Sequence, residues 1–333
     1  MPKEAAWILL YRGVDITGDL DPMTTSVRYT DKLHGEADEI EVAVQDKDGR
    51  WRGPWCPEPS DTMELWYGWK GVPGTYAGRF ELDEPEAQIG RGGDTMTMRG
   101  IAAPITASLR TERTADYEDM TVEDIANKVA SRAGLTVKGR FNATKWRRKT
   151  QRRMRDLEFL VQLGEDTDHY VSVRGKEVQF WPVDEIDSAP PAATFTINHP
   201  DFVSFTGRFE TQGTNSKAET RYFHDEDKRL IKAEVKDDRV RTGDVLKIVE
   251  RTEDEVQAQL LAKGRLHQTN RNRRSGSLTL VGRPDLVAGS VIALGADFGK
   301  WAGRYVADAS DHSLTRGPYP TVLTLKEARE GAS

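Results

Sequence analysis

The most concentrated chemistry in the sequence is a basic segment between residues 145 and 155. It holds seven cationic side chains and one tryptophan: Lys145, Trp146, Arg147, Arg148, Lys149, Arg152, Arg153 and Arg155. Cations neutralise phosphates and an aromatic ring can stack on a base, so nucleic-acid binding is one interpretation. The other is a solvated segment or a contact with an acidic neighbouring subunit, since the chain is acidic elsewhere. We favour the subunit contact, with the seven cations as its candidate residues.

Residues that could hold a metal ion are dispersed. The single cysteine, Cys56, stands alone, and no two histidines are spaced three or four residues apart; they are His34, His169, His199, His224, His267 and His312. A metal site needs several ligands that converge. Asp46 and Asp48 suggest a calcium loop, but Arg50 and Arg52 follow and would repel the ion, so we interpret residues 46–49 as a hairpin turn. The sequence predicts no metal and no cofactor.

The sequence also lacks the short motifs of common catalytic sites. Gly-x-Ser-x-Gly, the phosphate-binding Gly-x-x-x-x-Gly-Lys and Gly-x-Gly-x-x-Gly are all missing from it. Carboxylates are abundant, so a cell-wall hydrolase that uses a pair of them remains an alternative. We predict that the protein is not an enzyme and that it has no catalytic residues.

Composition bounds the class of protein. A chain of 333 residues predicts two or three domains at roughly 100–200 residues each. The net charge of −6 argues against bulk binding to nucleic acid or to an anionic membrane. No apolar run approaches the ~20 residues of a membrane helix. One cysteine cannot form an internal disulfide, and residues 7–11 are typical of a strand, not a signal peptide, so we expect folding in a cytoplasm.

The elements that must position the basic segment follow from hydrophobic periodicity. Residues 1–105 predict short strands, for example at 39–45, where Ile40, Val42 and Val44 alternate onto one face. Residues 106–199 predict two helices and a hairpin: a helix capped by Thr121 and stopped by Gly134, and a second from Asp156 to about Gly164. The hairpin joins 170–173 to 177–181.

Residues 200–333 return to β-structure. Strands are expected at 277–281, 290–294, 304–307 and 322–325, together with one helix at 256–266 whose capping box begins at Thr252. The predicted fold class is β-rich, mixed α+β. The three ranges are the predicted domains, and two β-rich regions flank a middle α/β region.

Several segments resemble, in the same order, the late control gene D protein family, the hubs of contractile phage tails. Related proteins are the N-terminal part of VgrG spikes and the hubs of R-type pyocins. The matching segments are 37–51, 78–83, 98–103, 121–135, 156–163, 276–289 and 305–323. At Thr167-Asp168-His169 the family often carries a glycine, which puts the local turn in doubt. His312 falls in the closing motif and is expected to be a structural polar residue.

The resemblance implies two small antiparallel β-barrels linked by an α/β middle domain. It also implies a homotrimer whose six barrels form a ring. That ring joins the hexameric tail tube to the trimeric central spike, beside baseplate wedge proteins. No membrane and no specific nucleic acid is implied as partner, although a genome passes through the lumen. The expected location is the host cytoplasm during assembly and then the virion or tail-like particle.

Overall fold

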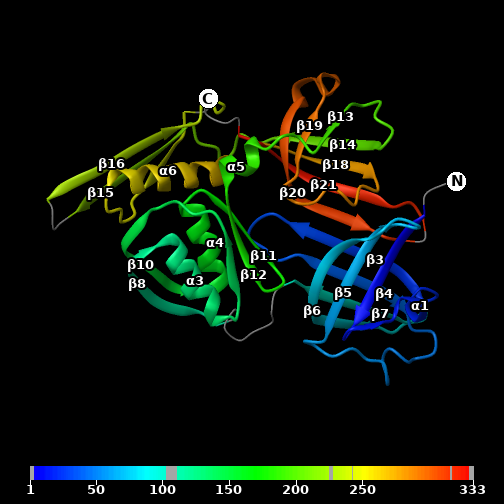
Figure 1. The fold of residues 1–333 in the computed structure, drawn as a ribbon. Helices are drawn as coiled ribbons and strands as arrows, with labels where there is room; N and C mark the ends of the chain where they lie inside the picture. Colours follow the sequence, from blue (N-terminus) through cyan, green and yellow to red (C-terminus); the bar gives the residue numbers. More distant parts are fainter. Residues whose placement is uncertain (1–3, 103–110, 225–227, 242, 316, 330–333) are drawn as a thin grey trace.

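The computed structural model describes residues 4–102, 111–224, 228–241, 243–315 and 317–329 (Figure 1). The N-terminal half is a set of antiparallel strands with one short helix. Its elements are β1 (Ala5–Tyr11), β2 (Val14–Asp15), α1 (Thr17–Leu20), β3 (Thr24–Lys32), β4 (Glu39–Gln45), β5 (Thr62–Trp69), β6 (Thr75–Gln88) and β7 (Thr95–Ile101). The alternation predicted at 39–45 is confirmed, because Ile40, Val42 and Val44 are fully buried in the core of this half.

The C-terminal half is a second strand-rich region with its own core around Phe195, Tyr305 and Leu323. Its elements are β13 (Ala193–Phe195), β14 (Phe202–Phe209), β18 (Arg274–Val281), β19 (Val291–Leu294), the 3₁₀ helix η1 (Ala296–Trp301), β20 (Gly303–Ser313) and β21 (Pro320–Glu327). The four strands predicted here from the sequence are confirmed.

The two halves share one 13-stranded sheet. β20 pairs in antiparallel fashion with β3, from Ala309 opposite Lys32 to Ser313 opposite Arg28. Figure 1 shows the C-terminal half above the N-terminal half on the right, with the strands of both in contact. The predicted β-rich α+β fold class is confirmed. The structure also shows that one hydrogen-bonded sheet runs through both β-rich halves.

The middle region packs two helices against short sheets on the left of Figure 1. Its elements are β8 (Arg113–Thr121), α3 (Val122–Arg132), β9 (Thr136–Gly139), β10 (Lys145–Met154), α4 (Asp156–Asp166), β11 (His169–Arg174), β12 (Glu177–Pro182) and α5 (Val183–Ser188). Thr121 caps α3 in a capping box with Asp124, as predicted, and Gly134 follows with a φ of 70°. The hairpin of β11 and β12 is also confirmed.

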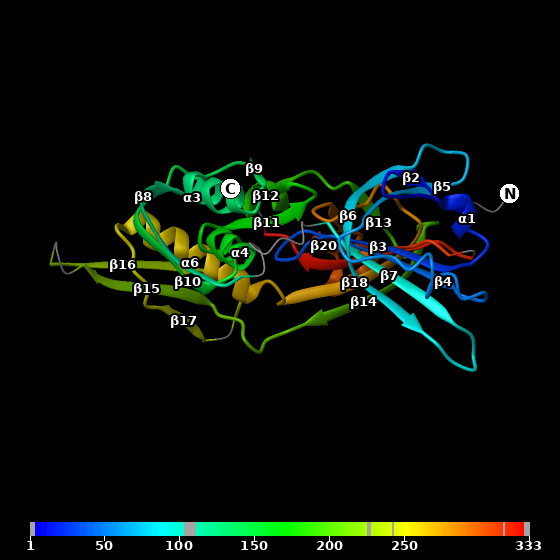
Figure 2. The same ribbon diagram turned by 90° about the horizontal axis from the view of Figure 1, so that it is seen from below.

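A fourth sheet and the longest described helix form an arm inserted between β14 and β18 in the sequence. The sheet consists of β15 (Lys217–His224), β16 (Arg229–Lys236) and β17 (Val245–Ile248), and the helix is α6 (Glu255–Asn270). Figure 2 shows α6 between this sheet and the middle region. At its crossing with α4, a Cβ on Gly264 would lie 2.0 Å from the backbone oxygen of Glu165, so only glycine permits this approach.

Three local predictions need correction or completion. Gly164 does not end α4, which continues to Asp166; it lies against β11, where a Cβ would meet Val171 at 2.2 Å. The cap of α6 is Asp254 and not Thr252, and the helix extends to Asn270. The turn at the departure from the family motif is made by Asp168, whose φ of 60° is the left-handed conformation that glycine favours.

The predicted domain limits stay predictions. The first limit, at 105/106, lies outside the described residues. The second, at 199/200, falls between β13 and β14, and β13 pairs in parallel with β19.

Candidate functional site

The basic segment is a strand. Residues 145–154 form β10, which pairs with β8 through an antiparallel register that shifts between Gln151 and Met154. The shift is a β-bulge, and Arg153 within it has a φ of 46°. A bulge breaks the alternation of side chains, and here both Arg152 and Arg153 are exposed.

A buried polar network fixes the bulge. Gln151 is fully buried; its amide donates 2.9 Å hydrogen bonds to the Met154 carbonyl and to Asp156, and its Oε1 accepts from Tyr117. Asp156, also fully buried, receives two hydrogen bonds from the Arg132 guanidinium, at 2.8 and 3.2 Å. Because each buried group is partnered, the bulge is held in one conformation.

The cations of β10 differ in their partners. Arg148 forms a two-point ion pair with Asp116, 2.7 and 3.2 Å, and the hydrogen bonds from Arg148 and Thr150 lower the pKa of Asp116. Lys149 contacts the buried Asp166 at 2.5 Å. Within the described residues, neither Arg152 nor Arg153 has a carboxylate within ion-pair distance.

A groove of about 910 Å³ brings four of the seven candidate residues together. Arg148, Lys149, Arg152 and Arg153 line it from β10. The opposite lining includes Thr114 and Asp116 of β8, Gln162 of α4, and Val249, Glu250 and Arg251 of the segment before α6. We call this the basic groove. The other three candidates lie elsewhere: Lys145 at a neighbouring cleft, and Arg147 and Arg155 exposed outside the groove lining. The spacing of the cations could not indicate the segment 249–251, which is remote in sequence.

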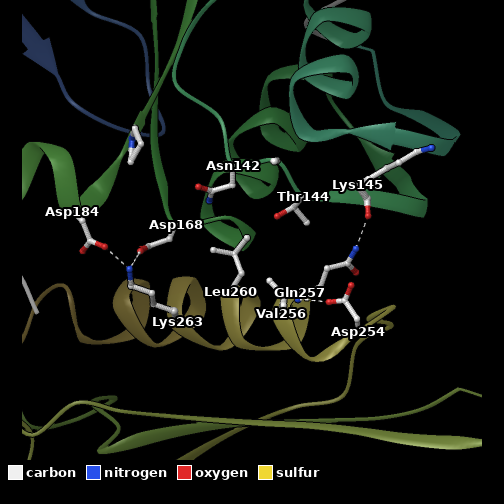
Figure 3. Close-up of a pocket in the computed structure, with 12 residues that line it drawn as sticks. Asn142, Thr144, Lys145, Asp168, Asp184, Asp254, Val256, Gln257, Leu260 and Lys263 are labelled. Carbon is white, nitrogen blue, oxygen red and sulfur yellow. Dashed lines mark hydrogen bonds and ion pairs between the residues drawn. The ribbon is translucent and has the colours of Figure 1, made fainter.

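The neighbouring cleft, about 550 Å³, separates the loop before β10 from α6 (Figure 3). At one end, Lys263 contacts Asp184 and Asp168, the latter at 3.1 Å; at the other, Gln257 donates to the Lys145 carbonyl at 2.6 Å. Burial raises the pKa of Asp184, but the hydrogen bond from Lys263 together with the charges of Arg329 and Lys263 outweighs it and lowers the pKa overall. The polar groups of the cleft thus mainly satisfy one another.

Sequence reasoning missed a buried junction between the three regions. Asp31 in β3 accepts a 2.7 Å hydrogen bond from Arg174 at the end of β11 and a 2.9 Å one from the Ala288 amide of the C-terminal half. Asp38 also contacts the guanidinium, at 3.7 Å from its Nε. Burial, with the charge of Asp31, raises the pKa of Asp38. We call Asp31, Asp38 and Arg174 the buried junction.

His312 lies in the same interior and holds β20 against the N-terminal half. It contacts the hydroxyls of Ser310 at 3.0 Å and Tyr319 at 2.9 Å, and packs against the Tyr67 ring at 4.7 Å. Burial lowers the pKa of His312 to about 4, so it is neutral at pH 7. These contacts fit the structural role expected for it.

The structure also bears on the other features considered in the sequence. Asp46 accepts backbone hydrogen bonds from Trp51 and Arg52 at 3.0 and 3.3 Å, which agrees with a turn. The prediction of a hairpin at this turn is wrong, because β4 pairs with β3 and β7 and not with β5. Among the described residues, no three His, Cys, Asp or Glu side chains are grouped as metal ligands. No described helix is long and apolar enough to cross a membrane. Trp146, proposed as a stacking ring, is only 3% exposed and lies beneath Lys149.

Two curated relatives match the chain in sequence. It is 26% identical over 237 residues to the probable baseplate hub protein of Escherichia phage 186 and 28% identical over 177 residues to that of Escherichia phage P2. The matches cover 69% and 52% of this chain but only 59% and 44% of the relatives. No protein-family model matches the chain.

Solved structures share the fold. A tail protein from Neisseria meningitidis MC58 superposes with a TM-score of 0.75 over 97% of both chains at 14% identity. The 43 kDa tail protein of prophage MuSo2 from Shewanella oneidensis gives 0.71 over 97% of this chain and 98% of that one, also at 14%. An E. coli type VI secretion component similar to T4 tail proteins gp27 and gp5 gives 0.58 over 95% and 76%, at 11%. The resemblance to phage tail hubs and VgrG-like proteins is therefore confirmed.

Proposed function

We propose that this chain is a structural hub protein in the baseplate of a contractile phage tail or a tail-like injection particle. Three copies form a ring that joins the tail tube to the central spike, with wedge proteins around it. The chain would assemble in the host cytoplasm and then remain in the particle. The two relatives are both named as probable hub proteins, which supports this assignment and a non-enzymatic role.

The observation that carries the proposal is the sheet shared by the two β-rich halves. Because β20 pairs with β3, each chain presents two strand-rich bodies in a fixed relation. Three chains would offer six such bodies, which suits a six-fold tube on one side and a three-fold spike on the other. A chain with this arrangement can adapt one symmetry to the other without a catalytic site.

The test is the mass in solution, measured by light scattering with and without the spike protein. A trimer of the 37.4 kDa chain, about 112 kDa, is expected in at least one of the two conditions. A strict monomer in both would contradict the ring, and DNA binding and cell-wall hydrolysis would then be the functions to measure.

The basic segment is proposed to contact an acidic neighbour in the particle. Replacing Arg147, Arg148, Arg152 and Arg153 by glutamate should block particle assembly while the isolated chain still folds. Assembly that survives the four replacements would show that the segment is dispensable. Binding to nucleic acid is less supported, because the buried Trp146 cannot stack on bases.

A further inference from the structure

The backbone of β10 has an open side. In the described part of the chain β10 pairs with β8 alone, in a sheet of two strands. Near its start, Gln257 donates a 2.6 Å hydrogen bond to the Lys145 carbonyl. From Arg148 to Arg152, no backbone–backbone hydrogen bond to another described residue is present besides those to β8, so the outward N–H and C=O groups of these residues face the side where a third strand would lie. An open edge of this length is a template for an added strand.

The basic groove contains both β10 and an apolar contact. Val249 is 81% exposed, although it lines the groove beside Glu250 and Arg251. An isolated apolar side chain at such a position can pack against an apolar residue of an extended segment, whose two neighbours point to the opposite face because side chains alternate along a strand. The groove therefore suits an extended segment that carries apolar residues at intervals.

The charge of the groove indicates which polar residues a bound extended segment would carry. Its two carboxylates already have partners: Asp116 pairs with Arg148 at 2.7 Å, and Glu250 lies 3.4 Å from Arg265. Arg152 and Arg153 have no ion-pair partner in the described residues, and the bulge directs both to solvent. The groove therefore has unbalanced positive charge, which favours carboxylates in its ligand.

We propose that the free edge of β10 accepts an extended acidic segment of another particle protein as a third strand. Its carboxylates pair with Arg152 and Arg153, and an apolar side chain between them contacts Val249. The identity of the donor as a particle protein rests on the proposed function; the binding mode rests on the groove alone. Among the described residues that line the groove, the buried Trp146 is the one aromatic side chain, which disfavours single-stranded nucleic acid as the occupant.

The probe is a fluorescent peptide of alternating glutamate and valine, with the 10-residue length of β10. Binding to the full chain is measured by fluorescence anisotropy. Reversing both charges, Arg152→Glu with Arg153→Glu, should weaken binding by at least about tenfold. The matched control is Arg91→Glu, an exposed arginine in the loop between β6 and β7, which should leave affinity unchanged.

A second probe tests the strand itself. The same peptide with alternate amides N-methylated keeps its charges but loses backbone donors, so its affinity should fall by at least about tenfold. Three results would overturn the proposal: equal affinity of the double variant, equal affinity of the methylated peptide, or tighter binding of a lysine–valine peptide or an oligonucleotide. If the peptide fails to bind while light scattering still shows a trimer, strand addition fails and the hub assignment stands.

Discussion

The buried junction and the basic groove both combine arginine with carboxylates, yet the two regions hold those carboxylates in opposite environments. In the junction, Asp31 is 1% exposed and is held by a backbone amide and by Arg174, whose own side chain is 37% exposed. In the groove, the Arg148 and Asp116 side chains are 49% and 39% exposed. A buried carboxylate that loses its partner remains desolvated, whereas an exposed one regains water. The junction is therefore expected to contribute more to stability than the exposed ion pair of the groove does.

The largest loss of stability is expected where the arm packs closely against the middle region, at the crossing of α6 with α4. Gly264→Ala places a Cβ 2.0 Å from the Glu165 backbone oxygen, so α6 must move away from α4. We expect the free energy of unfolding to fall by about 3 kcal/mol in urea titrations. Gly243→Ala is the control, since nothing lies within 4 Å of its added Cβ. Equal stability of the two variants would mean that the crossing adjusts at little cost.

The next effect tests the junction charge directly. Asp31→Ala leaves the Ala288 amide without its acceptor and removes a partner of Arg174. A loss of about 2 kcal/mol in unfolding free energy is expected. The matched change in the groove, Asp116→Ala, should cost less than about 1 kcal/mol because that pair is exposed. If the two losses were similar, burial would not be what separates the regions.

An effect confined to acidic pH is expected at His312. Its folded pKa, about 4, lies below the ordinary value of 6.5, so the folded state resists protonation. The stability it contributes is complete above pH 6.5 and is lost as the pH falls toward 4. Wild-type protein should therefore lose up to about 3 kcal/mol across this window relative to His312→Gln, measured by urea unfolding at several pH values. Parallel pH profiles would exclude a buried neutral imidazole.

The smallest effect on stability is expected in the basic groove. Replacing Arg152 and Arg153 by alanine should change the free energy of unfolding by less than about 0.5 kcal/mol, because both side chains are exposed. Thermal melts of the variant and wild type check this. A large loss would place the two arginines with the junction instead of with the binding surface.

Local signals in the sequence predicted the elements well. The cap at Thr121 and the alternation at Ile40, Val42 and Val44 depend on near neighbours, and both are confirmed. Gly164 was misread because glycine serves two purposes: it can end a helix, or it can admit a neighbouring strand, and only the position of Val171 decides. The end of α6 was also predicted too early. Its last turn is buried through contacts with other parts of the fold, and the local sequence does not show these contacts.

The candidate site was predictable only in part. The cations of residues 145–155 were visible as a run, but the bulge that exposes Arg152 and Arg153 depends on Gln151 binding Asp156 and Tyr117. The junction was not visible at all, since Asp31 and Arg174 are 143 residues apart in sequence. Contacts over such separations follow from the packing of whole regions, which no short pattern contains.

The pairing of β20 with β3 also has a mechanical side. The strands run antiparallel, and five residue pairs, from Ala309–Lys32 to Ser313–Arg28, connect the two halves. A load directed along these strands would stretch all of their hydrogen bonds at once, in shear. A load perpendicular to them would break the hydrogen bonds one after another, starting from one end. The direction of a load on this seam would then decide whether the two halves move together or come apart.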